Sequence, residues 1–237
     1  MERTLVISDI HGCYDQLIEL LNIVHYNSDL DRLILLGDYV DRGKFSKEVI
    51  EKVIEMVQGS NVIALRGNHD QRFVDLMMGN DDSAPKFFQH GGSETLKSYI
   101  EIDNMANWRD ARDYIMKHYS HHISFLGGLP LFYEDEQFIY VHAGLNPAYM
   151  NWKDQPKDDF MWIRDEFIKQ AIAVNKTVVF GHTKTIDIHG SADIWFGEGK
   201  IGIDGGCSFG QQLNCLEILG AFKYITHKFN ASERDLI

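Results

Sequence analysis

Five short blocks of metal-binding residue types recur along this chain, and each one directly follows an apolar run. They are Asp9-Ile10-His11, Gly37-Asp38-Tyr39-Val40-Asp41-Arg42-Gly43, Gly67-Asn68-His69-Asp70, His142-Ala143-Gly144 and Gly181-His182-Thr183. Carboxylate, imidazole and amide donors without a thiolate suit manganese, iron, zinc or similar ions. A carboxylate with ligands on either side can bridge two ions about 3.5–4 Å apart, and Asp38 is the natural bridge. The blocks therefore predict a two-metal site.

The same blocks supply the other parts of a phosphoryl-transfer site. A metal-bridging water is acidic enough to be the nucleophile at neutral pH. An arginine matches two oxygens of a phosphoryl group, and a histidine held by an aspartate can protonate the leaving alkoxide. The expected reaction is metal-dependent hydrolysis of a phosphoric ester by in-line attack of a metal-activated water.

The apolar runs have the spacing of a parallel sheet. Short runs over residues 5–8, 33–36 and 62–65 predict strands, and helical spacing over residues 15–24 and 49–57 predicts the helices between them. Strand–helix–strand order implies parallel strands with right-handed crossovers. Ligands of such sheets bind at the carboxyl ends of the strands, so the blocks should lie side by side.

The rest of the chain continues in shorter elements. Residues 70–127 are expected to be helical with a break at 81–85, and strands at 131–133 and 138–142 are expected to form a hairpin. These are followed by a helix over Phe160–Ala173 and by strands near 177–180, 193–196, 200–203, 213–219 and 222–226. Because no repeat, linker or low-complexity tract interrupts the chain, residues 1–237 are predicted to form a single domain.

In this order the blocks resemble the phosphoprotein phosphatase family of the calcineurin-like metallophosphoesterases, in its bacterial serine/threonine phosphatase form. The second block, GDYVDRG, is highly specific, and the match covers nearly the whole chain. The resemblance implies an α/β fold with a central β-sandwich flanked by helices. It also implies two divalent metal ions, with manganese expected first and iron, zinc or nickel as alternatives.

The resemblance implies a role for each residue of the site. The metal ligands would be Asp9, His11 and Asp38 for the first ion and Asp38, Asn68, His142 and His182 for the second. The catalytic pair would be His69 and its partner Asp41, and the phosphate-binding arginines would be Arg42 and Arg164. Arg66 is expected to pair with Asp70 rather than to touch phosphate.

Two departures bear on the substrate class. Protein phosphatases usually have Glu and Gly where this chain has Asp70 and Ala143, and both features resemble diadenosine tetraphosphate hydrolases of the same superfamily. The intact VDRG ending of the second block instead favours a protein serine/threonine phosphatase. A polyphosphate needs extra cations, and the sequence has no Lys/Arg cluster near the five blocks beyond Arg42, Lys44 and Arg66. We therefore expect a phosphoprotein or phosphopeptide substrate, with bis(5'-nucleosyl)-tetraphosphatase activity as the alternative.

Composition bounds the partners and the compartment. The 237 residues include 23 Lys plus Arg and 35 Asp plus Glu, which gives a formal net charge of −12 at pH 7. Such an acidic surface repels nucleic acid and anionic lipid. Three cysteines without CxxC spacing indicate free thiols in a reducing compartment, and the apolar run at residues 5–7 is too short for a signal peptide. A cytoplasmic enzyme without nucleic-acid or membrane partners is expected, and no oligomeric state is predicted.

Overall fold

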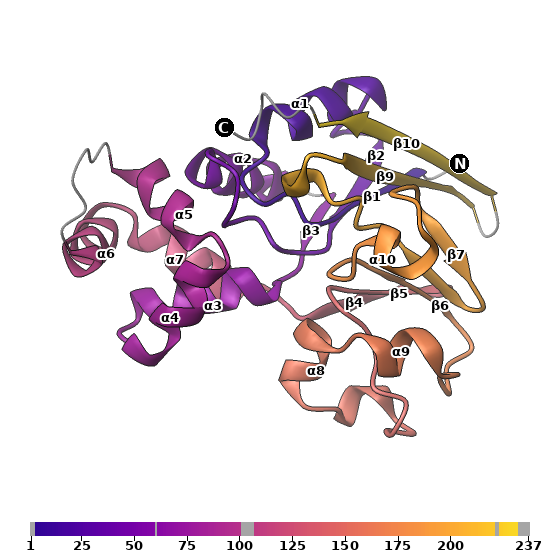
Figure 1. The fold of residues 1–237 in the computed structure, drawn as a ribbon. Coiled ribbons are helices and arrows are strands. Elements are labelled where there is room, and N and C mark those ends of the chain that lie inside the picture. The colour runs from indigo at the N-terminus through magenta and orange to yellow at the C-terminus, as the bar shows by residue number, and fades with distance from the viewer. Residues whose placement is uncertain (1–2, 60, 101–106, 221–222, 232–237) are drawn as a thin grey trace.

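Two five-stranded β-sheets pack face to face at the centre of the protein (Figure 1). The computed structural model describes residues 3–59, 61–100, 107–220 and 223–231. The first sheet has the order β10 (Lys223–Asn230), β9 (Gln212–Leu219), β1 (Arg3–Ile7), β2 (Asp31–Leu35) and β3 (Val62–Ala64). The second has the order β4 (Phe132–Glu134), β5 (Phe138–Val141), β6 (Thr177–Phe180), β8 (Lys200–Gly202) and β7 (Trp195–Gly197). The predicted β-sandwich flanked by helices is confirmed.

The two faces of each central strand enter different cores, because side chains alternate along a strand. In β1, Leu5 and Ile7 lie in the core beneath the helices, whereas Val6 lies in the core between the sheets. In β6, Val179 lies between the sheets, whereas Phe180 lies in the core on the other side of the second sheet. Burial on both faces explains why these strands are apolar runs rather than alternating patterns.

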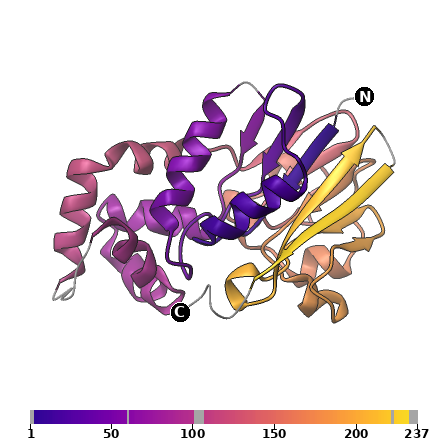
Figure 2. The ribbon, with the colours of Figure 1, turned by 90° about the horizontal axis from the view of Figure 1, so that it is seen from above.

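Helices cover the outer faces of both sheets and form a lobe beyond β3 (Figures 1 and 2). The first sheet is covered by α1 (Tyr14–Ile23) and α2 (Ser46–Gln58), and the second by α8 (Lys157–Trp162) and α9 (Asp165–Lys169). The lobe consists of α3 (Asn68–Met77), η1 (Asp81–Ser83), α4 (Ala84–Gln89), α5 (Gly92–Tyr99), α6 (Trp108–His118) and α7 (Ser120–Gly128). Three further elements are η2 (Trp152–Asp154), α10 (Thr185–His189) and η3 (Cys207–Phe209).

Some expectations lie beyond what the structure tests. Residues 101–106 of the expected helical segment and residue 222 of the last expected strand lie outside the described residues. The assignment of residues 1–237 to a single domain stays a prediction. Within the described ranges, no helix combines the length and the hydropathy needed to cross a membrane.

The predicted continuous helix over Phe160–Ala173 is wrong. The chain forms α8 and α9 instead, with Ile163 and Arg164 between them in non-helical backbone. In a continuous helix the carbonyl oxygen of Phe160 would accept from the N–H of Arg164. Here it accepts from the N–H of Ala143 at 2.8 Å, so a contact with the fourth block replaces one helical hydrogen bond.

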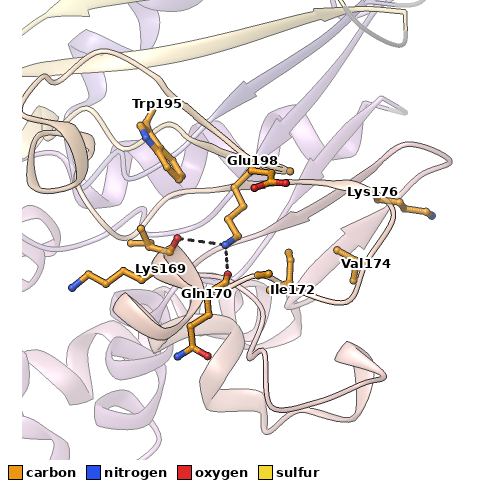
Figure 3. A pocket seen from close by; sticks show the side chains of 11 residues that line it. Lys169, Gln170, Ile172, Val174, Lys176, Trp195 and Glu198 are labelled. Carbon is orange, nitrogen blue, oxygen red and sulfur yellow. Dashed lines mark hydrogen bonds between the residues drawn. The ribbon is translucent and has the colours of Figure 1, made fainter.

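Lys200 accounts for the end of α9 at Lys169, four residues before the predicted helix end at Ala173. Its Nζ donates to the carbonyl oxygens of Phe167 and Gln170 at 2.6 Å each and of Ile168 at 3.4 Å. The N–H groups of a longer helix would otherwise occupy such carbonyls. The cavity bordered by this lysine lies between the chain after α9 and the β7–β8 hairpin, and none of the predicted site residues lines it (Figure 3).

Candidate metal centre

The five blocks meet where the two sheets bring the carboxyl ends of their parallel strands together. Strands β1, β2 and β3 pair in parallel, and so do β5, β6 and β8. Hydrogen bonds join the two sets of strand ends. Asp9 Oδ2 accepts from the N–H of His182 at 2.9 Å, and His142 Nδ1 donates to the carbonyl oxygen of Leu36 at 2.9 Å. The strand ends therefore lie side by side, as predicted.

Asp38 lies between two groups of buried donors. Its Oδ2 is 3.4 Å from His11 Nε2 and 3.5 Å from His142 Nε2. The ligand atoms of Asp38, His11 and His69 lie within 4.8 Å of one another. The group formed by Asp38, His142 and His182 meets the same limit of 4.8 Å. Since both groups contain Asp38, the centre has the form of two adjoining sites that share one carboxylate. All of these side chains are at most 6% exposed.

Asp9 and Asn68 lie at the edges of these two groups. Asp9 Oδ1 is 4.0 Å from His11 Nε2, and its Oδ2 accepts from Ser8 Oγ. Asn68 Oδ1 is 3.0 Å from His142 Nε2. The structure thus brings all six predicted ligands together, and their assignment as ligands stays a proposal.

Two imidazole nitrogens indicate that a cation fits here. Because His142 donates through Nδ1, its Nε2 carries a lone pair, yet this lone pair faces the acceptors Asn68 Oδ1 and Asp38 Oδ2. His182 Nε2 is buried and has no hydrogen-bond partner. A metal ion among these atoms would satisfy them together, and the mixed oxygen and nitrogen donors suit manganese, iron or zinc.

Burial disfavours the charged forms of the carboxyl and imidazole groups in this centre. Desolvation raises the pKa of the Asp9 and Asp38 carboxyl groups and lowers the pKa of His11 and His182. The neighbouring charge of Asp38 further raises the pKa of Asp9. Divalent cations would offset these costs, because they favour ionised carboxylates and neutral imidazoles and separate buried like charges.

The backbone of the centre adopts a conformation that side chains disfavour. The angle φ is positive at Asp9 (53°), His11 (46°), Asp38 (59°), Asp41 (72°), Arg42 (71°) and His182 (62°). Left-handed backbone costs a non-glycine residue about 1–2 kcal/mol. One glycine is needed for a different reason: a Cβ at Gly67 would collide with the carboxylate of Asp38.

His69 and Asp41 form a buried pair that Thr95 supports. His69 Nδ1 lies 2.6 Å from Asp41 Oδ2. Thr95 Oγ1 donates to Asp41 Oδ1 at 2.7 Å and accepts from the N–H of Asp41 at 2.8 Å. The pair is therefore fixed in orientation, with His69 Nε2 directed towards the arginine of the second block at 2.9 Å.

Three arginines lie near enough to Asp38 for their charges to act on it, and two of them were predicted. The positive charges of Arg42, Arg72 and Arg164 lower the pKa of Asp38, against the larger opposing effect of burial. Arg72, which was not predicted, is 6% exposed, and its buried Nη1 has no hydrogen-bond partner. It follows His69 by three positions on α3 and so shares its helix face, which is the signal that the sequence carries.

The expected pairing of Arg66 with Asp70 is wrong. Arg66 Nη1 donates at 2.9 Å to the carbonyl oxygen of Gly127, in the last turn of α7. Carbonyls at the end of a helix lack helical partners and attract cations. Asp70 is fully buried and accepts main-chain N–H groups around the start of α3 instead, including that of Gly67 at 2.9 Å.

Asp204 is a buried carboxyl group of the centre that was not predicted. It follows β8, and its Oδ1 accepts from the N–H of Gly206 at 2.9 Å. Burial, together with the charge of Asp9, raises the pKa of Asp204 well above its usual range. The signal is present in the chain, because Ile203-Asp204-Gly205-Gly206 repeats the pattern of a strand followed by an acid and glycine.

Comparisons with known proteins agree with this geometry. The family model of the calcineurin-like phosphoesterases matches residues 2–220. A symmetrical bis(5'-nucleosyl)-tetraphosphatase of Nitrosomonas europaea is 31% identical over 149 residues, which are 63% of this chain and 46% of that protein. The chain spans less than half of the length of the curated relatives that it matches first.

Two solved structures share the fold. One is a putative diadenosine tetraphosphatase, with a TM-score of 0.65, 22% identity, and coverage of 96% of this chain and 93% of that one. The other is a protein serine/threonine phosphatase from Saccharomyces cerevisiae, with a TM-score of 0.62, 16% identity, and coverage of 98% and 81%. At these identities the likeness concerns the fold alone.

Proposed function

This chain belongs to the calcineurin-like phosphoesterase family, and we propose that it hydrolyses dinucleoside tetraphosphates symmetrically. Hydrolysis of phosphoproteins, the first expectation from the sequence, becomes the competing function. The observation that carries the proposal is the third arginine at the centre, Arg72, which is buried and has an Nη1 without a hydrogen-bond partner. The symmetrical tetraphosphatases among the relatives support the same choice.

A tetraphosphate chain demands more positive charge than a phosphomonoester does. With a formal net charge of −12, the protein as a whole repels a polyanion, so compensation must be local. Arg42, Arg72 and Arg164 supply it around Asp38. Each planar guanidinium can match two phosphate oxygens, so the trio can hold phosphates beyond the one attacked.

The proposed mechanism divides the work between ligands, arginines and the His69–Asp41 pair. Two divalent ions on Asp9, His11, Asp38, Asn68, His142 and His182 would supply an acidified water and neutralise phosphoryl oxygens. Arg42 and Arg164 orient the phosphoryl group. As the water oxygen bonds to phosphorus and the central P–O bond breaks, the departing nucleoside diphosphate takes the bonding electron pair. His69, held by Asp41 at 2.6 Å, delivers a proton to the leaving oxygen.

The competing substrate differs in its leaving group. A phosphoserine side chain leaves as an alkoxide, which needs a proton, whereas a nucleoside diphosphate leaves as a stabilised anion and needs less help. It also differs in charge, because a phosphoserine presents a single phosphoryl group to the three arginines. Both differences can be measured on one preparation of enzyme.

The test compares kcat/KM for diadenosine tetraphosphate and for a phosphopeptide, side by side with added manganese. We expect at least a tenfold preference for the dinucleotide, with adenosine diphosphate as the sole nucleotide product. Arg72→Leu should lower kcat/KM for the dinucleotide roughly ten- to a hundredfold, the worth of a charged hydrogen bond. Arg109→Leu is the matched control, because this arginine is half exposed and pairs with Asp81. A preference for the phosphopeptide would refute the proposal.

A further inference from the structure

Trp162 exposes its indole at the edge of the metal centre. The residue is 42% exposed and ends α8. Its ring centroid lies 6.2 Å from that of His182, with the ring planes at 83°. The guanidinium carbon of Arg72 lies 5.1 Å from the centroid of the same ring. The indole therefore borders both a proposed metal ligand and the third arginine.

Packing does not account for this indole. Phe160 and Ile163, on either side in the chain, are 3% and 8% exposed and belong to the core outside the second sheet. Trp162 belongs to none of the three buried clusters of the described residues. An indole left in water forgoes the gain of burying a large aromatic surface. The exposed part of the indole is therefore available to a ligand at the edge of the metal centre.

A second exposed aromatic residue near the centre already has two cationic side chains against its ring. Phe209 is 53% exposed, but the cationic groups of Arg42 and Lys184 lie 4.8 Å and 4.7 Å from its ring centroid. Trp162 has one cation, Arg72, against its ring. Phe209 is the more exposed ring but has two cations against it, whereas Trp162 has one, so we assign the flat ligand to Trp162.

We propose that Trp162 is the stacking platform for one nucleobase of the dinucleotide, a role that rests on the function proposed above. Every nucleobase has a flat aromatic face, and stacking on an aromatic side chain strengthens binding about tenfold or more. Because Arg72 lies against the same indole, a base stacked there has its own phosphates beside a guanidinium. One residue pair thus recognises both parts of a nucleotide, the ring and the phosphate.

The test compares a substrate that has bases with one that has none. Trp162→Leu keeps apolar bulk but loses the aromatic face, and Trp162→Phe restores an aromatic ring. We expect Trp162→Leu to lower kcat/KM for diadenosine tetraphosphate about tenfold more than for inorganic tripolyphosphate, mainly through KM, and Trp162→Phe to recover most of this loss. The matched control is Phe196→Ala, because Phe196 is 48% exposed and packs against Tyr224 instead.

A binding measurement gives a readout that does not depend on turnover. A diadenosine tetraphosphate analogue with a methylene group at the central bridge should quench tryptophan fluorescence, and Trp162→Phe should remove most of the quench although three other tryptophans stay in place. Wild-type enzyme that leaves diadenosine tetraphosphate intact would overturn the proposed function and this inference together. Wild-type turnover combined with equal losses on both substrates in Trp162→Leu would overturn the stacking role alone.

Discussion

The carboxylate of Asp70 holds the main chain of Asp38 in place: Asp70 Oδ2 accepts from the N–H of Asp38 at 2.8 Å. The other oxygen accepts from the N–H of Tyr39 at 2.9 Å, and Oδ2 also accepts from Gly67 at 2.9 Å. One buried side chain therefore ties the second block to the third. It fixes the backbone on which the proposed bridging carboxylate stands.

Removing this carboxylate should destabilise the protein strongly. Asp70→Ala leaves three buried N–H groups without acceptors, and each costs about 1–3 kcal/mol. Because losses above about 5 kcal/mol are exceptional for one substitution, we expect the free energy of unfolding to fall by about 3–5 kcal/mol, the lower part of the summed range. Urea denaturation measures the loss. Asp75→Ala, on the same helix but half-buried, is the control and should cost about 1 kcal/mol or less. Similar losses for the two variants would contradict the proposed role.

His69 should matter most when the leaving group is a poor one. His69→Asn should lower kcat on alkyl phosphates roughly 10²–10⁴-fold, the usual worth of general acid catalysis. The loss should shrink for p-nitrophenyl phosphate and for diadenosine tetraphosphate, whose leaving groups need little protonation. Because His69 also lies near His11 and Asp38, elemental analysis separates proton donation from metal binding. Loss of metal from the variant would make His69 a ligand instead.

Asp38 should control the occupancy of both metal sites. Asp38→Asn removes the negative charge shared by the two donor groups, so the purified variant should bind both ions more weakly than wild type does. Elemental analysis after dialysis against low metal concentrations gives the stoichiometry. The exposed Asp29→Asn provides a charge-matched control. Two ions retained at wild-type affinity in Asp38→Asn would exclude a bridging role.

His122 should make the protein less stable in acid. It is 1% exposed, its Nδ1 lies 2.9 Å from Tyr99 Oη, and burial lowers its pKa from 6.5 to about 4. Between these values the unfolded chain binds a proton that the native chain does not, so the free energy of unfolding falls as pH falls, by about 1.4 kcal/mol per pH unit.

Comparing a non-titrating variant with wild type isolates this effect. His122→Gln should lose less stability than wild type between pH 6.5 and 4.5, as measured by urea denaturation at a series of pH values. His118→Gln, at an exposed histidine, is the control and should follow wild type. Parallel curves for wild type and His122→Gln would show that the buried imidazole does not contribute.

The strand ends could be predicted because a buried apolar run is followed there directly by metal-binding residue types. Residues 5–7 and 178–180 are apolar on both faces, and a polar block follows each of them. A parallel sheet places such blocks at one edge, so neighbours in space follow from the pattern without coordinates. The hydrogen bond from the His182 N–H to Asp9, which joins the two sheets, does not follow from the pattern.

The missed helix break and the missed arginine depend on how the chain folds, whereas the missed carboxylate has an ambiguous local pattern. The helix expected at residues 160–173 breaks because the Phe160 carbonyl oxygen accepts from Ala143, and no local propensity records that bond. Arg72 comes two residues after the end of the third block. It comes close to the other two arginines only once α3 has formed. Asp204 has the right local pattern but a single acid, which by itself is more often a turn residue.

The left-handed backbone at six residues of the centre bears on the evolutionary history of the chain. Glycine adopts that conformation without penalty, so each substitution by glycine there would relieve strain in the folded state. In a lineage that had abandoned catalysis and kept only a binding scaffold, nothing would oppose such stabilising replacements. In this chain Asp9, Asp38 and His182 keep their side chains at positive φ, the state expected where those side chains are needed for chemistry. Among proteins of this fold, the number of these positions occupied by glycine should therefore distinguish catalytically active members from inactive ones.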